Sequence, residues 1–171
     1  VYGGYVSRPG LKLGNSVIIE GKISYYFGML QLTDINVTIT ELAPDNPHSV
    51  INIDYIEDKT VINTNNPIMF GNLVTITDLV AIGGYDSSDN AFTIKTTYVD
   101  KDGNNIRLDI RVGNNTNLVG PDGRITSYEY FVGKTIKSLT AVISYYDYNT
   151  DDTKEGYIQM MLSSFKDIVL E

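Results

Sequence analysis

The sequence predicts an all-β protein, and the patterning of its 171 residues carries that prediction. Apolar and polar residues alternate with a period of two in stretches such as 17–25 and 107–112, which is typical of half-buried strands. Turn-forming residues such as Asp102-Gly103 separate these stretches. No window of a dozen residues carries a convincing apolar stripe of helical period, which completes the all-β prediction.

The composition excludes several kinds of chemistry. The chain has no Cys and one His, which excludes a thiol nucleophile, a disulfide, a Cys-ligated metal and a two-His metal site within one chain. No stretch approaches the roughly 18 consecutive apolar residues that a membrane span needs. We therefore expect no metal, no cofactor and no membrane span.

Five strands can be placed in the second part of the chain. They are expected at 71–84, 90–99, 105–112, 133–147 and 156–170. The second and third form one hairpin, and the fourth and fifth form another. A stretch of about 20 residues between the third and fourth strands is expected to hold a helix or loop that caps a barrel.

The chain also contains an internal repeat. An opening strand that begins with Gly, the tetrapeptide Ile-Ser-Tyr-Tyr and a following apolar strand recur in the same order. The opening lies at 14–19 and 71–76 and, in a looser form, at 133–137. The tetrapeptide lies at 23–26 and 143–146. The following strand lies at 30–32 and 158–160. We predict that residues 14–42 and 133–171 are two copies of one strand–loop–strand unit.

The spacing of the two copies predicts a β-bulge. The offset between them is 119 residues at the opening glycine and 120 residues at the tetrapeptide, so the second copy holds one extra residue. A strand absorbs one extra residue without turning its later side chains to the other face only through a bulge. We predict this bulge between Lys137 and Thr140, with three side chains facing the barrel interior: Ile136, Ile143 and Tyr145.

The order of strands resembles the OB-fold, a five-stranded Greek-key barrel. The opening pattern Gly-Asn-x-Val-x-Ile, at Gly14 and again at Gly71, is similar to that of OB domains repeated in secreted bacterial nucleases and surface proteins. The resemblance implies an OB-like barrel at 71–171, a connector with one short strand at 43–70, and a partial copy with strands three to five at 1–42. Because a partial barrel leaves open edges, we expect another segment or chain to cover them.

The resemblance also implies a binding face on the second and third strands of the barrel. Alternation points Lys95, Arg107 and Arg111 outward there, where a positive groove can follow a phosphate backbone. The other outward positions, Thr93, Thr97 and Asp109, supply no aromatic ring for base stacking. The alternative is a solvated strand face on which the two arginines pair with Asp109.

Other candidate residues have weaker patterns. Alternation buries Tyr25 and Tyr145 and exposes Tyr26 and Tyr146, so Tyr146 is a candidate for ring stacking on a ligand, and packing is the alternative. The acidic loop at 147–155 could bind calcium, although its spacing matches no known calcium loop and a solvated loop is the alternative. The single histidine, His48, has no evident partner, and no pair of residues indicates catalysis.

The charge distribution limits the function classes. The net charge is −8, which disfavours general nucleic-acid binding, but residues 91–137 carry seven basic and five acidic residues and are locally positive. We expect a non-catalytic binding module of a larger secreted or surface bacterial protein, with single-stranded nucleic acid as its ligand. The Tyr-, Asn-, Thr- and Gly-rich composition without Cys agrees with a secreted or surface location. The alternative is a structural or protein-interaction module, and the absence of Trp disfavours carbohydrate binding.

Overall fold

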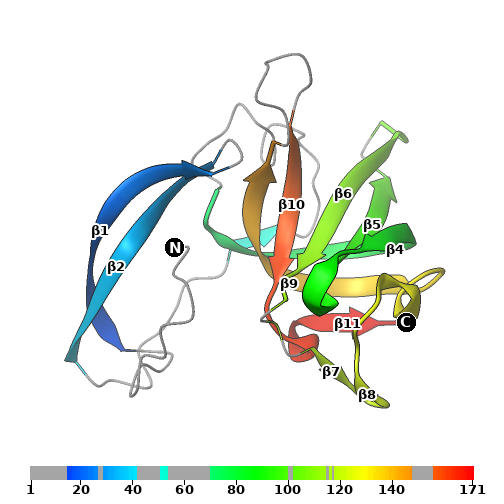
Figure 1. The fold of residues 1–171 in the computed structure, drawn as a ribbon. Coiled ribbons are helices and arrows are strands. Elements are labelled where there is room, and N and C mark those ends of the chain that lie inside the picture. The colour runs from blue at the N-terminus through cyan, green and yellow to red at the C-terminus, as the bar shows by residue number, and fades with distance from the viewer. Residues whose placement is uncertain are drawn as a thin grey trace. The chain divides into compact units, whose positions relative to one another are not determined.

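The structure, a computed structural model, describes residues 15–26, 29–41, 51–53, 70–99, 102–114, 116, 118–147 and 156–171. These residues fall into two compact units, one with strands β1 and β2 and the other with strands β3 to β11 (Figure 1). The helices within the described ranges are 3₁₀ turns of three residues each, η2 (Ser88–Asn90), η3 (Tyr128–Tyr130) and η4 (Phe165–Asp167). The prediction of an all-β protein is confirmed.

Five strands of the second unit close into a barrel. They are β4 (Leu73–Asp86), β5 (Phe92–Val99), β6 (Asn105–Val112), β9 (Thr135–Tyr146) and β10 (Tyr157–Leu162). Their order is β4-β5-β6-β10-β9, and β9 pairs back with β4. The β6–β10 pair is parallel and the other four pairs are antiparallel. This arrangement confirms the OB-like five-stranded Greek-key barrel.

Shorter elements complete the unit. Strand β3 (Ile51–Ile53) pairs in parallel with β4, so the short strand expected in the connector is present. Strand β11 (Ile168–Leu170) pairs with β9. Between β6 and β9, where a cap was expected, lie a hairpin of β7 (Val119–Gly120) and β8 (Gly123–Arg124) and the η3 turn.

The barrel core follows from the alternation along each strand. Inward positions of the five strands are buried, as in Phe92 and Ile94 on β5 and Ile110 on β6, each 0% exposed. The segment between β6 and β9 adds Leu118, Ile125 and Phe131 to the same core. The expected cap is therefore a loop that inserts apolar side chains, and no long helix is needed to close the core.

The bulge predicted in the fourth barrel strand is present. Ile136 and Ile143 are both buried, although their residue numbers differ by an odd number. Ser138 pairs with Val169 and Ile136 pairs with the next residue, Leu170, so Lys137 is the extra residue of β9, at the edge of the predicted interval. Tyr145 shares the face of Ile143 but is half-buried near the end of β9, where its ring packs on Phe70.

Strand β4 carries a matching extra residue, which the sequence analysis did not anticipate. Ile76 pairs with Leu139 and Leu79 pairs with Ile136, so Asp78 lies opposite Lys137. At this point the inward positions of both strands change between even and odd residue numbers, and the mutual register of the strands is preserved. Asp78 has a φ of 58°, in the left-handed region that most side chains avoid.

The first unit is a two-stranded antiparallel sheet of β1 (Ser16–Tyr26) and β2 (Met29–Glu41). Its register shifts between Glu20 and Lys22. The third strand predicted for the partial copy and the turn at 27–28 lie outside the described residues. The expectation that Tyr25 is buried was wrong, because this residue is 77% exposed.

We expect Asp78 to require a residue that tolerates a left-handed backbone. Asp78→Val should lower the free energy of unfolding by about 1–2 kcal/mol, because a β-branched side chain is strained at positive φ. Asp78→Gly should leave stability within about 0.5 kcal/mol of the wild type. Urea unfolding measures both, and Lys137→Val is the matched control on the opposite strand. Equal losses for the two valine variants would contradict the role of the backbone at Asp78.

Candidate ligand-binding face

The three cations singled out from the sequence lie on one outer face of the barrel. Lys95 on β5 is opposite Asp109 on β6, and the neighbouring cross-strand pairs are Thr93 with Arg111 and Thr97 with Arg107. The residues that alternate with them on both strands, such as Ile94 and Ile110, are buried in the core. The arrangement therefore follows directly from the strand period of two and the register of the β5–β6 hairpin.

Tyrosines from three other positions join this face. Tyr157 on β10 pairs with Tyr146 on β9, and their ring centroids are 5.7 Å apart. The hydroxyl oxygen of Tyr157 lies 3.2 Å from that of Tyr85 on β4. Strands β5 and β6 lie between β4 and β10 in the sheet, so this hydroxyl contact bridges the outer face of both. The aromatic rings that the sequence analysis found missing come from neighbouring strands.

Each of two cations lies over a tyrosine ring. The guanidinium carbon of Arg107 is 5.7 Å from the ring centroid of Tyr157, and the Lys95 Nζ is 5.9 Å from that of Tyr85. Both distances are within the range of a cation–π attraction. Alternation on β10 could have identified Tyr157 as outward, since Ile158 and Met160 belong to or pack on the core. We will call Tyr85, Tyr146, Tyr157, Lys95, Arg107 and Arg111 the Tyr–Arg face.

A buried carboxylate holds Arg107 in place. Arg107 donates from Nε to Asp109 Oδ1 at 2.7 Å and from Nη2 to Asp109 Oδ2 at 2.6 Å. The Asp109 side chain is 1% exposed and that of Arg107 is 54% exposed. The hydrogen bond to Asp109 raises the pKa of Arg107 above its ordinary value. For Arg107, the pairing considered as the alternative to ligand binding is thus observed.

Arg111 has different partners from those expected. Its Nη1 donates to the hydroxyl of Ser87 at 2.9 Å and to that of Thr93 at 3.2 Å. Pairing of Arg111 with Asp109 was therefore a wrong expectation, because Asp109 uses both carboxylate oxygens for Arg107. Both of these partners are neutral, and among the described residues Arg111 forms no ion pair with a carboxylate.

Polar side chains form the floor of the face. Asp109, Gln159 and Ser144 are cross-strand neighbours on β6, β10 and β9, and each is less than a tenth exposed. They alternate along their strands with residues of the core, yet they are buried, and Asp109 lies under its partner Arg107. The face can therefore present rings and charges to a ligand without moving its floor.

Burial alters the acidity of one ring. It raises the pKa of the Tyr157 hydroxyl well above its usual value of 10.0, and the hydrogen bond with Tyr85 adds to the shift. Tyr157 consequently stays neutral at physiological pH, able to donate or accept a hydrogen bond. The chemistry of the face is that of stacking, hydrogen bonding and positive charge.

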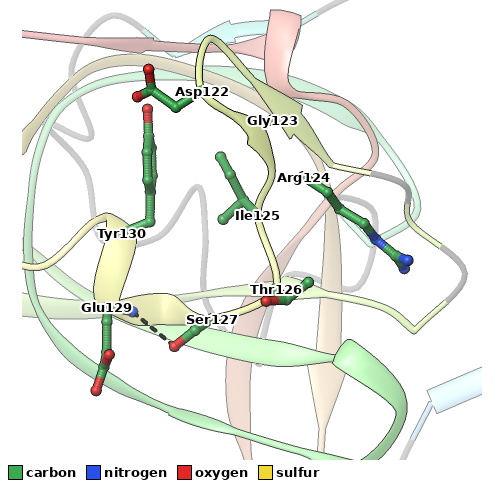
Figure 2. A pocket seen from close by; sticks show the side chains of 8 residues that line it. All are labelled: Asp122, Gly123, Arg124, Ile125, Thr126, Ser127, Glu129 and Tyr130. Carbon is green, nitrogen blue, oxygen red and sulfur yellow. Dashed lines mark hydrogen bonds between the residues drawn. The ribbon is translucent and has the colours of Figure 1, made fainter.

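A second hollow lies beside the β7–β8 hairpin. Its volume is about 250 Å³, and Figure 2 shows the residues that line it: Asp122, Gly123, Arg124, Ile125, Thr126, Ser127, Glu129 and Tyr130. The Tyr130 hydroxyl end points toward Asp122, whereas the Arg124 side chain points away (Figure 2). Ser127 accepts a hydrogen bond from the Glu129 backbone at 3.2 Å. The hollow lacks converging charged donors, so we regard the Tyr–Arg face as the stronger candidate.

Other features predicted from the sequence fall outside the described part of the chain. His48 and residues 148–155 of the acidic loop are among them. Within the described residues, no group of three or more His, Cys, Asp or Glu could hold a metal ion. A search of the same residues found no helix that is long and apolar enough to cross a membrane.

Comparisons with protein-family models, with curated proteins and with solved structures found no match for this chain. The geometry of the Tyr–Arg face and the physical chemistry of its side chains are therefore the basis for inferring a function.

We expect the two partners of the Arg107–Asp109 pair to differ in their effect on stability. Arg107→Ala leaves a buried carboxylate without its cation and should lower the free energy of unfolding by about 2–3 kcal/mol. Asp109→Ala should lower it by only about 1 kcal/mol, because water already reaches the half-exposed guanidinium. Chemical unfolding of both variants measures this difference. Equal losses would show that Asp109 is not desolvated in solution.

We expect Tyr157 to make stability fall at high pH. Its pKa is raised in the folded state, so the stability it contributes is complete below pH 10.0, the usual value, and is lost as the pH rises further. The free energy of unfolding of Tyr157→Phe should decline less steeply above that pH than the wild type's. The slopes of the wild type and Tyr157→Phe should differ by less than roughly 1.4 kcal/mol per pH unit, which is the slope for the loss of one full proton. Tyr25→Phe, at a ring that is 77% exposed, is the control, and identical slopes for both variants would contradict the assignment.

Proposed function

We propose that this chain is a non-catalytic binding module that holds a single-stranded nucleic acid on the Tyr–Arg face. The observation that carries the proposal is the gathering of three cations and three tyrosines on the outer face of one OB-like barrel. Single-stranded nucleic acid combines regularly spaced phosphates with flat bases, and proteins bind it through positive grooves and aromatic rings. Both kinds of group are present here within one continuous sheet surface.

The charges divide into two roles. Arg107 is paired with Asp109, so its main contributions are to fix the Tyr157 ring and to offer the outer edge of its guanidinium. Lys95 and Arg111 have no carboxylate partner among the described residues, and they are the groups we assign to phosphate contacts. Two such contacts imply a modest affinity with a clear dependence on salt concentration.

The tyrosines supply the sequence-tolerant part of the binding. Tyr85 is 40% exposed, and Tyr146 and Tyr157 are half-buried with their rings close together. A ring that is already held by a hydrogen bond or a neighbouring ring loses little conformational entropy when a base stacks on it. Stacking on such rings contributes about 1–3 kcal/mol per base, with little preference for sequence.

The proposal assigns no reaction to the face. Asp109 is its buried acid, and its side chain is 1% exposed and paired with Arg107 through both oxygens, so a ligand on the face does not reach it directly. A binding module of this kind acts by holding a ligand for another part of a protein. We place it in a larger secreted or surface protein of a bacterium, and a structural or protein-interaction role is the alternative.

Oligonucleotide binding tests the proposal. Fluorescence anisotropy with a labelled 15-nucleotide oligothymidylate should show binding at about 50 mM salt, where phosphate contacts are strong. The double variant Lys95→Ala/Arg111→Ala should bind more weakly, and the slope of log affinity against log salt should become shallower by about 1.4, since each phosphate on a single strand contributes about 0.7. Tyr85→Leu should weaken binding about tenfold without changing the slope.

A matched control separates the face from the overall charge. Lys137→Ala/Arg124→Ala removes one lysine and one arginine that are both exposed and lie on β9 and β8. This variant has the same net charge as the first double variant and should bind nearly as the wild type does. Absence of wild-type binding at low salt, or equal loss in the two double variants, would overturn the proposal.

A further inference from the structure

The sheet of β1 and β2 has one face that is wholly apolar. Its cross-strand pairs are Tyr25 with Leu30, Ile23 with Leu32, Ile19 with Val37, and Val17 with Ile39. The opposite face is mainly polar and includes Lys22, whose Nζ lies 2.8 Å from Asp34 Oδ2. The sheet is therefore amphipathic, with the pattern of strands that line a core on one side.

This apolar face is open in the described structure. Ile23 is 72% exposed, Tyr25 is 77% exposed and Leu30 is 55% exposed. A two-stranded sheet is at best marginally stable in water without further strands or a packing partner. Each exposed aliphatic side chain also forgoes about 1.5–3 kcal/mol of burial energy. A packing partner that buries this face would therefore stabilise the sheet.

The barrel shows the same hairpin in its covered state. In the barrel, Ile143 pairs with Met160, Ser144 with Gln159 and Tyr145 with Ile158. In the first unit, Ile23 pairs with Leu32, Ser24 with Gln31 and Tyr25 with Leu30. The two hairpins therefore agree in sequence pattern, in antiparallel direction and in register at three successive pairs. The tetrapeptide repeat alone does not require the same cross-strand partners, so this agreement is additional evidence for the repeat.

Burial is where the two hairpins differ. Ile143 is 1% exposed and Met160 is 0% exposed, whereas Ile23 at the matching position is 72% exposed. In the barrel, β4 pairs along β9 and β6 pairs along β10, so the hairpin has a neighbour on each outer edge. Strands β1 and β2 pair only with each other among the described residues.

We propose that β1 and β2 are the fourth and fifth strands of a second OB-like barrel, completed by a three-stranded segment with the pattern of β4–β6. The segment lies in the same polypeptide, N-terminal to β1. One of its strands runs antiparallel along β1, as β4 does along β9, and another runs parallel along β2, as β6 does along β10. This inference is independent of ligand binding at the Tyr–Arg face.

Chain order identifies the source of the missing strands. In the complete barrel, β4, β5 and β6 all precede β9, and β6 ends at Val112. The offset between the starts of β9 at Thr135 and β1 at Ser16 is 119 residues. Applied to Val112, this offset places the counterpart of β6 N-terminal to β1. The segment that fits the open face is thus an upstream part of the polypeptide.

Thiol labelling tests the inference, since the chain contains no cysteine. Ile23→Cys places a probe on the apolar face, and Lys22→Cys is the control on the opposite face of the same strand. In the 171-residue chain both thiols should react at similar rates. In the barrel, about 60 residues separate the start of β4 from the start of β9, so the natural polypeptide is extended upstream by about this length for the comparison. In this extended polypeptide, Ile23→Cys should react at least about tenfold more slowly. Lys22→Cys should be unchanged.

Two other labelling results would contradict the inference. If Ile23→Cys reacts as fast in the extended polypeptide as in the 171-residue chain, the second barrel does not form and the inference is wrong. If Ile23→Cys is already protected in the 171-residue chain, with protection that rises with protein concentration and a dimeric mass by light scattering, a second copy covers the face instead. Tyr25→Cys, at a neighbouring exposed position, repeats the measurement independently and should give the same result as Ile23→Cys.

Discussion

The pairing of β4 with β9 closes the barrel, and the rest of the second unit depends on it. Both strands are long and have more than one partner: β4 pairs with β9 at 73–80 and with β5 at 80–86. A strand that follows the curve of a barrel bends, and a local extra residue bends it while its later side chains stay on the core side. Asp78 and Lys137 lie opposite each other at this point, so the two strands bend without loss of their mutual register.

The curvature of β4 connects the fold to the Tyr–Arg face. Beyond its pairing with β9, β4 shifts register against β5 between Ala81 and Gly83. A side chain at Gly84 would collide with the backbone oxygen of Thr93 and with the Tyr128 ring, so glycine permits the close approach of β4 to β5. Tyr85 follows immediately and reaches across β5 and β6 to Tyr157. Barrel closure and assembly of the face therefore depend on the same strand.

Local patterns were sufficient to predict the five barrel strands but not all of their contacts. The last strand, expected at 156–170, is shorter than predicted, because β10 ends at Leu162 and is followed by η4 and the separate strand β11. Alternation and turn residues predict the barrel strands, and the one-residue difference between the two copies predicts the bulge at Lys137. The outward direction of Lys95, Arg107 and Arg111 follows from the same alternation. Tyr85 and Tyr157 were missed because they join the face through β4 and through the parallel β6–β10 pair, which bring together residues distant in sequence. The partners of Arg111 and the matching bulge at Asp78 likewise depend on tertiary neighbours.

The two hairpins show which part of a strand's environment its own sequence determines. The segments Ile-Ser-Tyr-Tyr at 23–26 and 143–146 direct the same pairing register in both units. The register depends on side chains within the hairpin, so it appears wherever the sequence appears. Burial depends on the neighbouring strands, so Ile143 is enclosed while Ile23 is exposed. An apolar hairpin face that has the pairing register of the barrel hairpin but is not buried therefore indicates that its sequence is suited to neighbouring strands like those of the barrel.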